Sequence, residues 1–382
     1  MGADMSEHMR PMDEQKSRGP EPSRRLADLP GYGRGRAGQA TPFAHRLGSN
    51  EAPDAPTAAV QAAVAAAIAG ANRYPDLRGE TLAAALAKRH GVPADCVAVS
   101  AGSVVMLDQL VRAYCDPGDV VATPWRSYEA YPIIVGGAGA RMVEVPLDSA
   151  HRLDATAMLQ ACKGSSGFVG TRVVLVCNPN NPTGTALEPA ELDALLDALP
   201  KKALVILDEA YADYAGDAAT VAASPARRLA RHPNLAVLRT FSKAWGLAGM
   251  RVGYCLADPH IIAAVNAIAP PFPLPAPVLA AALAALGEEG VVAERVAAGV
   301  EQRHRMSEGL MAVGLPVARS LANFVWLPVG NGAEALTQHL RQAGIAVRCF
   351  AGEGVRITTG TAADTEAVLA AAAEWKSSVG RP

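Results

Sequence analysis

Residues 173–184 read VVLVCNPNNPTG, a predicted strand followed by a turn. Its first five residues are apolar and mostly β-branched, as in a strand that is buried on both faces of a parallel sheet. The Asn- and Pro-rich string that follows is typical of a turn. Because open α/β sheets bind ligands at the carboxyl ends of their strands, this turn is a candidate binding loop. An ordinary turn would explain the same residues, so the motif alone does not decide between the two.

More short apolar runs alternate with segments that have helical patterns. Residues 58–69 and 80–90 have high helix propensity, and Gly91 can cap the second of these segments. This alternation predicts an α/β fold with a mainly parallel sheet covered by helices. The other expected strands of the sheet lie at residues 97–100, 120–122, 204–207, 235–238 and 252–256.

A proline-rich segment predicts a domain boundary. Residues 269–277 read APPFPLPAP, and proline removes the backbone donor that a helix interior or a central strand needs. We expect a partly disordered N-terminal arm at residues 1–45, a large domain at 46–275 and a smaller α+β domain at 276–382. In the smaller domain the patterns predict a long helix over 278–312, strands at 323–327, 346–350 and 355–358, and a closing helix over 365–375.

The composition argues against several classes of protein. Half of the 382 residues are hydrophobic, and 35 Lys and Arg balance 37 Asp and Glu, so nothing favours nucleic acid or membrane as a partner. The N-terminal residues are polar and lack the apolar segment of a signal peptide. The six cysteines form no CxxC pair, and the eight histidines lack metal-ligand spacing. We therefore expect a cytoplasmic protein with reduced thiols and no metal.

Two further strand ends carry reactive groups. Asp208 follows the run ALVIL, where a carboxylate is costly to bury unless something pairs with it, although a helix N-cap would also explain it. Lys243 follows the next predicted strand. Three successive strand ends thus direct Asn181, Asp208 and Lys243 at one crevice. These groups suit pyridoxal phosphate (PLP), which needs an amine for a Schiff base, a carboxylate for its ring nitrogen and a donor for its phenolic oxygen.

A turn before a predicted helix is a candidate anion site. Residues 100–107 read SAGSVVML, and backbone N–H groups at such a helix start favour an anion. Ser242 and Arg251 can add a hydroxyl and a bidentate cation. A plain helix start would explain the string equally well.

The string SK-x-x-G-L-A-G-x-R-x-G at residues 242–253 resembles fold-type I PLP-dependent aminotransferases of the class I/II superfamily. The resemblance runs from SNEAP at residues 49–53 to RITTG at residues 356–360, within the group of histidinol-phosphate and bacterial aromatic-amino-acid aminotransferases. It implies the fold of these enzymes, PLP as the cofactor, amino acid and 2-oxo acid substrates, and a homodimer with shared active sites.

The resemblance also implies roles for the residues around the PLP ring. Lys243 would form the Schiff base and later act as a general base at the substrate Cα. Asp208 would bind the pyridine nitrogen, and Asn181 and Tyr211 would bind the phenolic oxygen. Tyr128 would stack on the ring.

The remaining implied roles concern the phosphate and the substrate. Arg356, with Asn181 beside it, would bind the substrate carboxylate. Tyr74 would reach the phosphate of the neighbouring subunit. The phosphate within the same subunit would be held by Gly102, Ser103, Val104, Thr240, Ser242 and Arg251.

Two departures from the commonest histidinol-phosphate pattern bear on the substrate. Val104 and Val105 stand where an acidic pair is usual, and residues 124–132 read PWRSYEAYP. Both are more similar to the phenylalanine-type branch, which implies an aromatic amino acid as the donor and 2-oxoglutarate as the acceptor. Three alternatives remain open: a histidinol-phosphate aminotransferase, a PLP-dependent decarboxylase, and a PLP-fold regulator. The regulator would need a DNA-binding segment, which residues 1–40 do not show.

Overall fold

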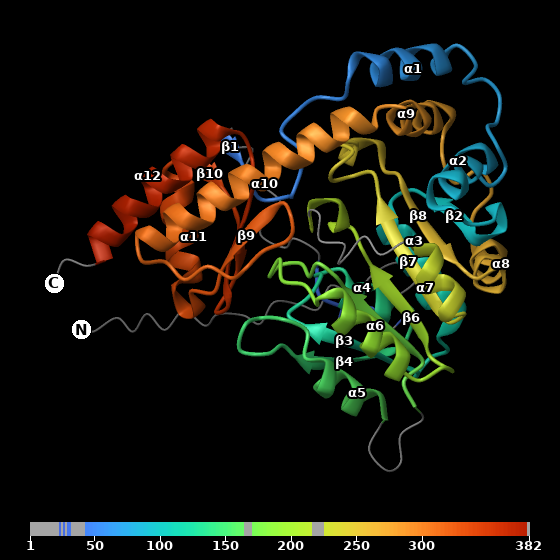
Figure 1. Cartoon of the computed structure of the whole chain (residues 1–382), viewed down its shortest axis with the longest axis horizontal. Helices are drawn as coiled ribbons and strands as arrows, with labels where there is room; N and C mark the ends of the chain where they lie inside the picture. Colours follow the sequence, from blue (N-terminus) through green and yellow to red (C-terminus); the bar gives the residue numbers. More distant parts are fainter. Residues whose placement is uncertain are drawn as a thin grey trace, which may run out of the picture.

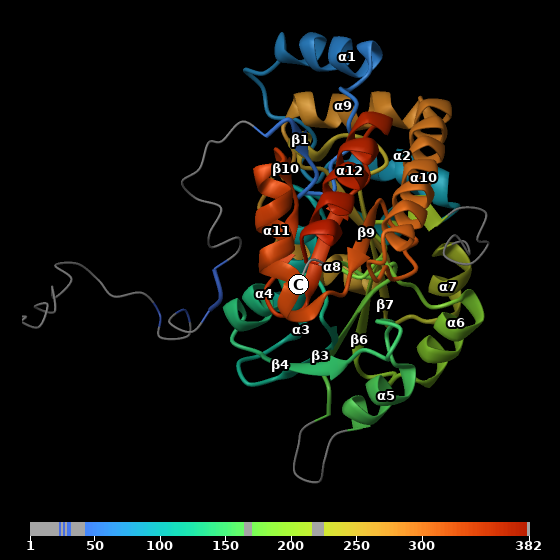
Figure 2. The same ribbon diagram turned by 90° about the vertical axis from the view of Figure 1, so that its left-hand side faces the viewer.

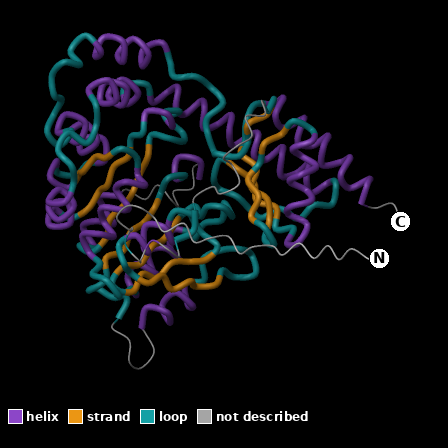
Figure 3. Tube along the Cα trace, turned by 180° about the vertical axis from the view of Figure 1, so that it is seen from behind, coloured by secondary structure: helices purple, strands orange, loops and turns teal. Residues whose placement is uncertain are grey.

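The computed structural model describes residues 43–163, 170–215 and 225–379, together with Ser23, Leu26 and residues 29–31. Within these residues the chain forms a large α/β body around a seven-stranded sheet and a smaller body around a three-stranded sheet (Figure 1). Seen from behind, the strands of the two sheets form separate groups (Figure 3). Most of the arm predicted at residues 1–45 lies outside the described residues.

The large sheet has the strand order β2–β8–β7–β6–β5–β3–β4. The five strands from β7 to β4 in this order pair in parallel, whereas β8 is antiparallel to both of its neighbours. The prediction of a mainly parallel sheet is therefore confirmed. The strands are β2 (Val97–Ser100), β3 (Val120–Trp125), β4 (Arg141–Pro146), β5 (Val173–Cys177), β6 (Leu204–Asp208), β7 (Leu235–Thr240) and β8 (Gly253–Ala257).

The edge strand β4 is absent from the sequence prediction. Its residues, RMVEVP, include two charged side chains, and all but Val145 are partly or fully exposed. Continuous apolar runs indicate only strands that are buried on both faces, so an edge strand of this kind does not stand out.

Helices cover both faces of the large sheet. They are α2 (Glu80–His90), α3 (Ser103–Tyr114), α4 (Tyr131–Gly137), α5 (Ala155–Lys163), α6 (Pro189–Ala198), α7 (Pro225–Arg231), α8 (Pro259–Ile268) and α9 (Ala276–Leu286). A further helix, α1 (Ala58–Ile68), packs on α9 (Figure 1). Successive strand residues point to opposite faces. On β6, Val205 and Leu207 therefore join a core with α2, α5, α6 and α9, while Leu204 and Ile206 join a second core with α3, α4 and α8.

The smaller body has its own sheet and its own core. Its sheet has the antiparallel order β11–β12–β9, with β9 (Phe324–Leu327), β11 (Arg348–Phe350) and β12 (Gly354–Thr358). Three helices pack around it (Figure 2): α10 (Glu289–Ala312), α11 (Ala333–Gln342) and α12 (Ala362–Val379). The early segment also belongs here, because β1 (His45–Arg46) pairs with β10 (Ile345–Ala346) and Leu47 enters this core.

The single long helix predicted over residues 278–312 is wrong. The chain forms two helices, α9 and α10, which meet at an angle of 79°. The break falls at Gly287 and Glu288, and the backbone of Glu288 is not helical (φ −117°, ψ 42°). The two helices have different partners: Leu279 of α9 packs in a core of the large sheet, and Met306 of α10 packs in the core of the smaller body.

Among the described residues, no single helix combines the length and apolar character that crossing a membrane requires. The bent pair α9 and α10 reaches that threshold only when both helices are taken together, by length and composition alone.

Gly253 allows the start of α3 to pack directly on β8. A Cβ atom at this position would overlap the backbone nitrogen of Ser103 and the carbonyl carbon of Gly102. We expect Gly253→Ala to lower the free energy of unfolding by about 2 kcal/mol, because backbone cannot move aside as a flexible side chain can. Urea unfolding followed by circular dichroism measures this.

Gly290, in the first turn of α10, is the matched control. A Cβ atom there meets nothing within 4 Å. Gly290→Ala should leave stability unchanged or raise it by up to about 1 kcal/mol, because alanine is the better helix former. Equal destabilisation by both substitutions would contradict this account of Gly253.

Candidate active site

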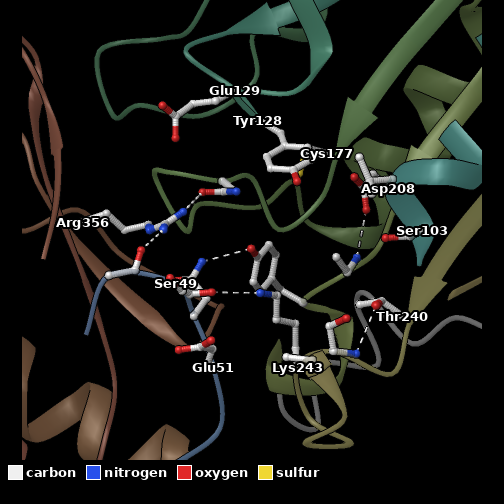
Figure 4. A pocket seen from close by; sticks show the side chains of 18 of the residues that line it. Ser49, Glu51, Ser103, Tyr128, Glu129, Cys177, Asp208, Thr240, Lys243 and Arg356 are labelled. Carbon is white, nitrogen blue, oxygen red and sulfur yellow. Dashed lines mark hydrogen bonds between the residues drawn. The ribbon is translucent and has the colours of Figure 1, made fainter. Parts of the chain in front are cut away.

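A cavity of about 310 Å³ lies at the carboxyl ends of β5, β6 and β7 (Figure 4). The loops after these strands, the start of α3, residues 48–51 and β12 contribute its wall. The three successive strand ends therefore converge as the sequence predicts. The predicted site residues that line the cavity are Ser103, Val104, Tyr128, Asn181, Asp208, Tyr211, Thr240, Ser242, Lys243, Arg251 and Arg356.

Asp208 ends β6 as a buried carboxylate. It accepts hydrogen bonds from the Tyr131 hydroxyl at 3.2 Å and from the backbone N–H of Ala210 at 3.2 Å. Burial raises the pKa of Asp208 to about 6, although both hydrogen bonds act in the opposite direction. Tyr131, which reaches this site from the first turn of α4, is not among the residues predicted from the sequence. The carboxylate is thus held by neutral donors and would gain from a cationic partner.

Lys243 lies in the loop that follows β7. Its Nζ donates a hydrogen bond to the backbone carbonyl of Ser49 at 3.1 Å and lies 5.8 Å from the centre of the Tyr211 ring. Burial, followed by the positive charge of Arg356, lowers the pKa of Lys243 to about 7. Near neutral pH a large share of this amine is therefore uncharged and can act as a nucleophile or a base.

The start of α3 and the loop after β7 form a place for an anion. Gly102 precedes α3 with a φ of +95°, and a Cβ atom there would lie 2.6 Å from an Arg251 guanidinium nitrogen. Arg251 donates to Ser242 Oγ at 3.3 Å, and the Ser242 N–H donates to Thr240 Oγ1 at 3.1 Å. A helix N-terminus, hydroxyls and a guanidinium group suit a phosphate.

Residues 47–51, which we call the strap, cross from the smaller body to the cavity. Asn50 is buried with a φ of +55° and donates from Nδ2 to the Tyr211 hydroxyl at 3.0 Å. Its backbone N–H donates to Thr358 Oγ1 at 2.9 Å, and the same hydroxyl donates to Asn50 Oδ1 at 2.9 Å. The string SNEAP at residues 49–53 carries part of the family resemblance, but the role of Asn50 is not predictable from it. Nothing local in these polar residues indicates contacts that lie more than 150 positions away.

Arg356, on β12, brings the smaller body into the site. Its guanidinium group donates to Asn181 Oδ1 and, at 2.8 Å, to the backbone carbonyl of Gly48. It also lies 5.4 Å from the centre of the Phe324 ring. The two residues predicted to bind the substrate carboxylate are therefore in direct contact.

Two predicted aromatic residues lie in different places. Tyr128 lines the cavity and packs edge-on against Tyr131, with ring centres 5.6 Å apart. Tyr74 is 81% exposed and stacks on Phe272, with ring centres 4.4 Å apart. Among the described residues of its own chain, Tyr74 is not part of the cavity wall. Its predicted contact with a neighbouring subunit stays a prediction.

Comparison with known proteins supports the assignment that this geometry suggests. Residues 45–373 match the family described as Aminotransferase class I and II. The aromatic amino acid aminotransferase of Thermobifida fusca is 45% identical over 328 residues, 86% of this chain and 89% of the relative. That of Streptomyces coelicolor is 43% identical over 352 residues, 92% of this chain and 96% of the relative.

A solved structure shows the same fold. The histidinol-phosphate aminotransferase from Sinorhizobium meliloti, in complex with pyridoxal-5'-phosphate, has a TM-score of 0.82 at 31% sequence identity, covering 88% of this chain and 92% of its own. This chain belongs to the class I and II aminotransferase family. It is an aminotransferase of fold type I, and both predictions are confirmed.

The hydroxyl of Thr358 anchors the strap, which gives a stability prediction. Thr358→Val keeps the side-chain shape but leaves two buried polar groups of Asn50 without the hydroxyl that they bind. We expect the free energy of unfolding to fall by about 2 kcal/mol, because each unsatisfied buried group carries a desolvation penalty. Urea unfolding measures the loss.

Thr337, in α11, is the matched control for this substitution. Its hydroxyl is buried and makes no hydrogen bond within the part of the chain that the structure describes. Thr337→Val should therefore be neutral or slightly stabilising. If Thr358→Val proved as mild as Thr337→Val, the strap would be held by other contacts.

Proposed function

We propose that this enzyme uses PLP to transfer the amino group of an aromatic amino acid to 2-oxoglutarate. The observation that carries the proposal is the meeting of Asp208 and Lys243 in one cavity beside an anion site. Relatives named aromatic amino acid aminotransferase, 43–45% identical over most of the chain, support the donor class.

The residues present fit PLP. A buried carboxylate with a raised pKa gains from a protonated pyridine nitrogen beside it. The N-terminus of α3, kept clear by Gly102 and Gly253, offers backbone donors to a phosphate, with Arg251 and Ser242 adjacent. Asp208 would hold the ring nitrogen, Lys243 would bind the cofactor covalently, and the anion site would hold its phosphate.

When bound, PLP supplies an electron-withdrawing ring that stabilises the negative charge left when the substrate Cα loses a proton. Lys243, with a pKa of about 7, can take up and release that proton through Nζ. Arg356 would hold the substrate carboxylate. Asn50 keeps the Tyr211 hydroxyl in place through its 3.0 Å hydrogen bond, so that Tyr211 and Asn181 present polar groups to the phenolic oxygen.

Histidinol phosphate is the second candidate donor. The observation that favours it is the similarity of the fold to the Sinorhizobium meliloti enzyme, at 31% identity. The curated relatives are more similar in sequence, and they carry the aromatic name. We keep the aromatic amino acid as the proposed donor for that reason.

We also propose a homodimer, and we keep the cytoplasmic location as a prediction. Three large apolar side chains within residues 68–77 of the large body are exposed: Ile68 at 59%, Tyr74 at 81% and Leu77 at 50%. Exposed apolar surface of this kind supports an interface with another chain. A second copy would also explain why the ring of Tyr74 stands outside its own cavity.

Lys243→Ala tests the proposed function directly. The variant should lose the near-visible absorbance band of the bound cofactor and the transamination of phenylalanine with 2-oxoglutarate together, because Lys243 is the one primary amine among the described residues of the cavity wall. Absorbance spectra and a keto-acid assay measure both. Lys202→Ala, at an exposed lysine away from the cavity, should retain both. Turnover retained in Lys243→Ala would refute the assignment.

The lowered pKa of Lys243 predicts a pH dependence for cofactor uptake by the apoprotein. With a pKa of about 7, the reactive uncharged form rises from roughly a tenth of the molecules at pH 6 to roughly nine tenths at pH 8. The rate at which the absorbance band appears should therefore climb through pH 7 and level off above pH 8. An ordinary lysine, with a pKa near 10.4, would instead gain about tenfold per pH unit throughout this range. A rate that keeps climbing beyond pH 9 would contradict the lowered pKa.

A further inference from the structure

Two arginines stand side by side on the sheet of the smaller body. Arg348 on β11 and Arg356 on β12 are directly opposed in the antiparallel register. Directly opposed residues project from the same face of a sheet, and like charges in such a pair repel each other. Arg356 contributes to the cavity wall. A second guanidinium group is therefore available beside the group that would bind the substrate carboxylate.

Glu129 neutralises that second arginine. Arg348 is buried, and its Nε donates to Glu129 Oε2 at 2.9 Å while a terminal nitrogen donates to Oε1. This bidentate contact uses two of the three guanidinium nitrogens. Glu129 follows Tyr128 in the loop after β3 and lines the cavity, whereas Arg348 is not part of the described cavity wall. In the view of Figure 4, Glu129 and Arg356 lie on the same side of the pocket, away from Asp208 and Ser103.

The charge at this end of the cavity therefore suits a monoanion. Arg356 contributes one positive charge, and the Glu129–Arg348 pair contributes none. An amino acid carries a carboxylate with one negative charge next to its amine-bearing carbon. Histidinol phosphate instead carries a phosphate ester, with a charge of about −1.5 to −2 near pH 7. A phosphate at this end would lie close to the negatively charged Glu129 carboxylate. Arg348, the second arginine that could bind the phosphate, is already paired with Glu129.

We propose that Glu129 is a specificity residue: by holding Arg348 in an ion pair, it selects donors that end in a carboxylate over donors that end in a phosphate ester. This inference rests on the proposed function and concerns the anionic group of the amino donor. Without the negative charge at position 129, Arg348 and Arg356 together would form a two-guanidinium site for a phosphate.

A second ion pair across the same interface provides the control. Arg126, three positions before Glu129, makes a bidentate contact with Glu353, in the turn between β11 and β12, from Nε at 2.9–3.0 Å. This pair also joins the loop after β3 to the smaller body, but neither partner contributes to the described cavity wall. Glu353→Gln therefore removes a similar contact between the two bodies without changing the charge that faces the substrate.

The test compares Glu129→Gln, Glu353→Gln and wild-type holoenzyme on histidine and histidinol phosphate. These two donors share a side chain and differ in the anion. The ratio of kcat/KM for histidinol phosphate to that for histidine should rise about tenfold or more in Glu129→Gln, the scale on which a changed polar contact alters selectivity. It should stay at the wild-type value in Glu353→Gln. The double variant Glu129→Gln, Arg348→Gln should lose the gain, because the uncovered cation is gone.

Calorimetric binding of histidinol phosphate to each holoenzyme gives a readout that does not depend on turnover. A Kd for histidinol phosphate that falls in Glu129→Gln, but not in Glu353→Gln, supports the proposal. An unchanged ratio and an unchanged Kd in a folded Glu129→Gln variant, or equal shifts in both single variants, would overturn it. If Glu129→Gln fails to fold, Glu129→Ala is measured in its place. Failure of the wild type to transaminate any amino acid would refute the proposed function instead, and the binding comparison would still decide the role of Glu129.

Discussion

The site depends on a carboxylate that the protein buries without giving it a cation in contact. Asp208 ends the central strand β6, and its two hydrogen bonds come from a tyrosine hydroxyl and a backbone N–H. Both donors are neutral, and burial raises the pKa of Asp208 to about 6. In the parallel sheet β5 and β7 flank β6, and Asp208 at the end of β6 is buried. A ligand that brings a positive charge to this point offsets the cost of burying the Asp208 carboxylate.

The second constraint is the joining of two bodies that have separate cores. The strap starts in the core of the smaller body at Leu47 and ends against Tyr211 and Lys243 in the large one. Arg356 spans the same gap in the opposite direction, from β12 to Asn181. The cavity is thus closed by polar contacts between the bodies, together with the packing of Tyr211 against Ala322 and Phe324 of the smaller body. Its shape therefore depends on groups that come from both ends of the chain.

The sequence predicted best what local physics determines. Short β-branched runs such as residues 173–177 and 204–207 were sufficient for the central strands and for the convergence of Asn181, Asp208 and Lys243. It predicted least where distant partners decide. Asn50 and Tyr131 have no local signature, because their roles arise only when the strap and α4 come to rest beside Tyr211 and Asp208.

The break between α9 and α10 was not predicted from the sequence, because it too depends on distant contacts. Both flanking segments favour helix, and a single Gly in a helical pattern is often tolerated. What separates the two helices is their burial against different cores, which is a property of the assembled fold. The pairing of Arg348 with Glu129 is of the same kind: its partners are 219 positions apart, and only the folded chain brings them together.

Burial moves the two reactive groups of the site toward each other on the pH scale. The same loss of water raises the pKa of Asp208 to about 6 and lowers that of Lys243 to about 7, so both change charge close to neutrality. A direct salt bridge between them would lower the pKa of Asp208 and raise that of Lys243 toward their ordinary values. The amine would then be charged, and the carboxylate would already have a cationic partner. The fold avoids this by giving Lys243 a backbone carbonyl of the strap and Asp208 a tyrosine hydroxyl. Burying Asp208 and Lys243 without a salt bridge between them costs local stability. It also leaves the carboxylate and the amine available to a ligand that can bind both.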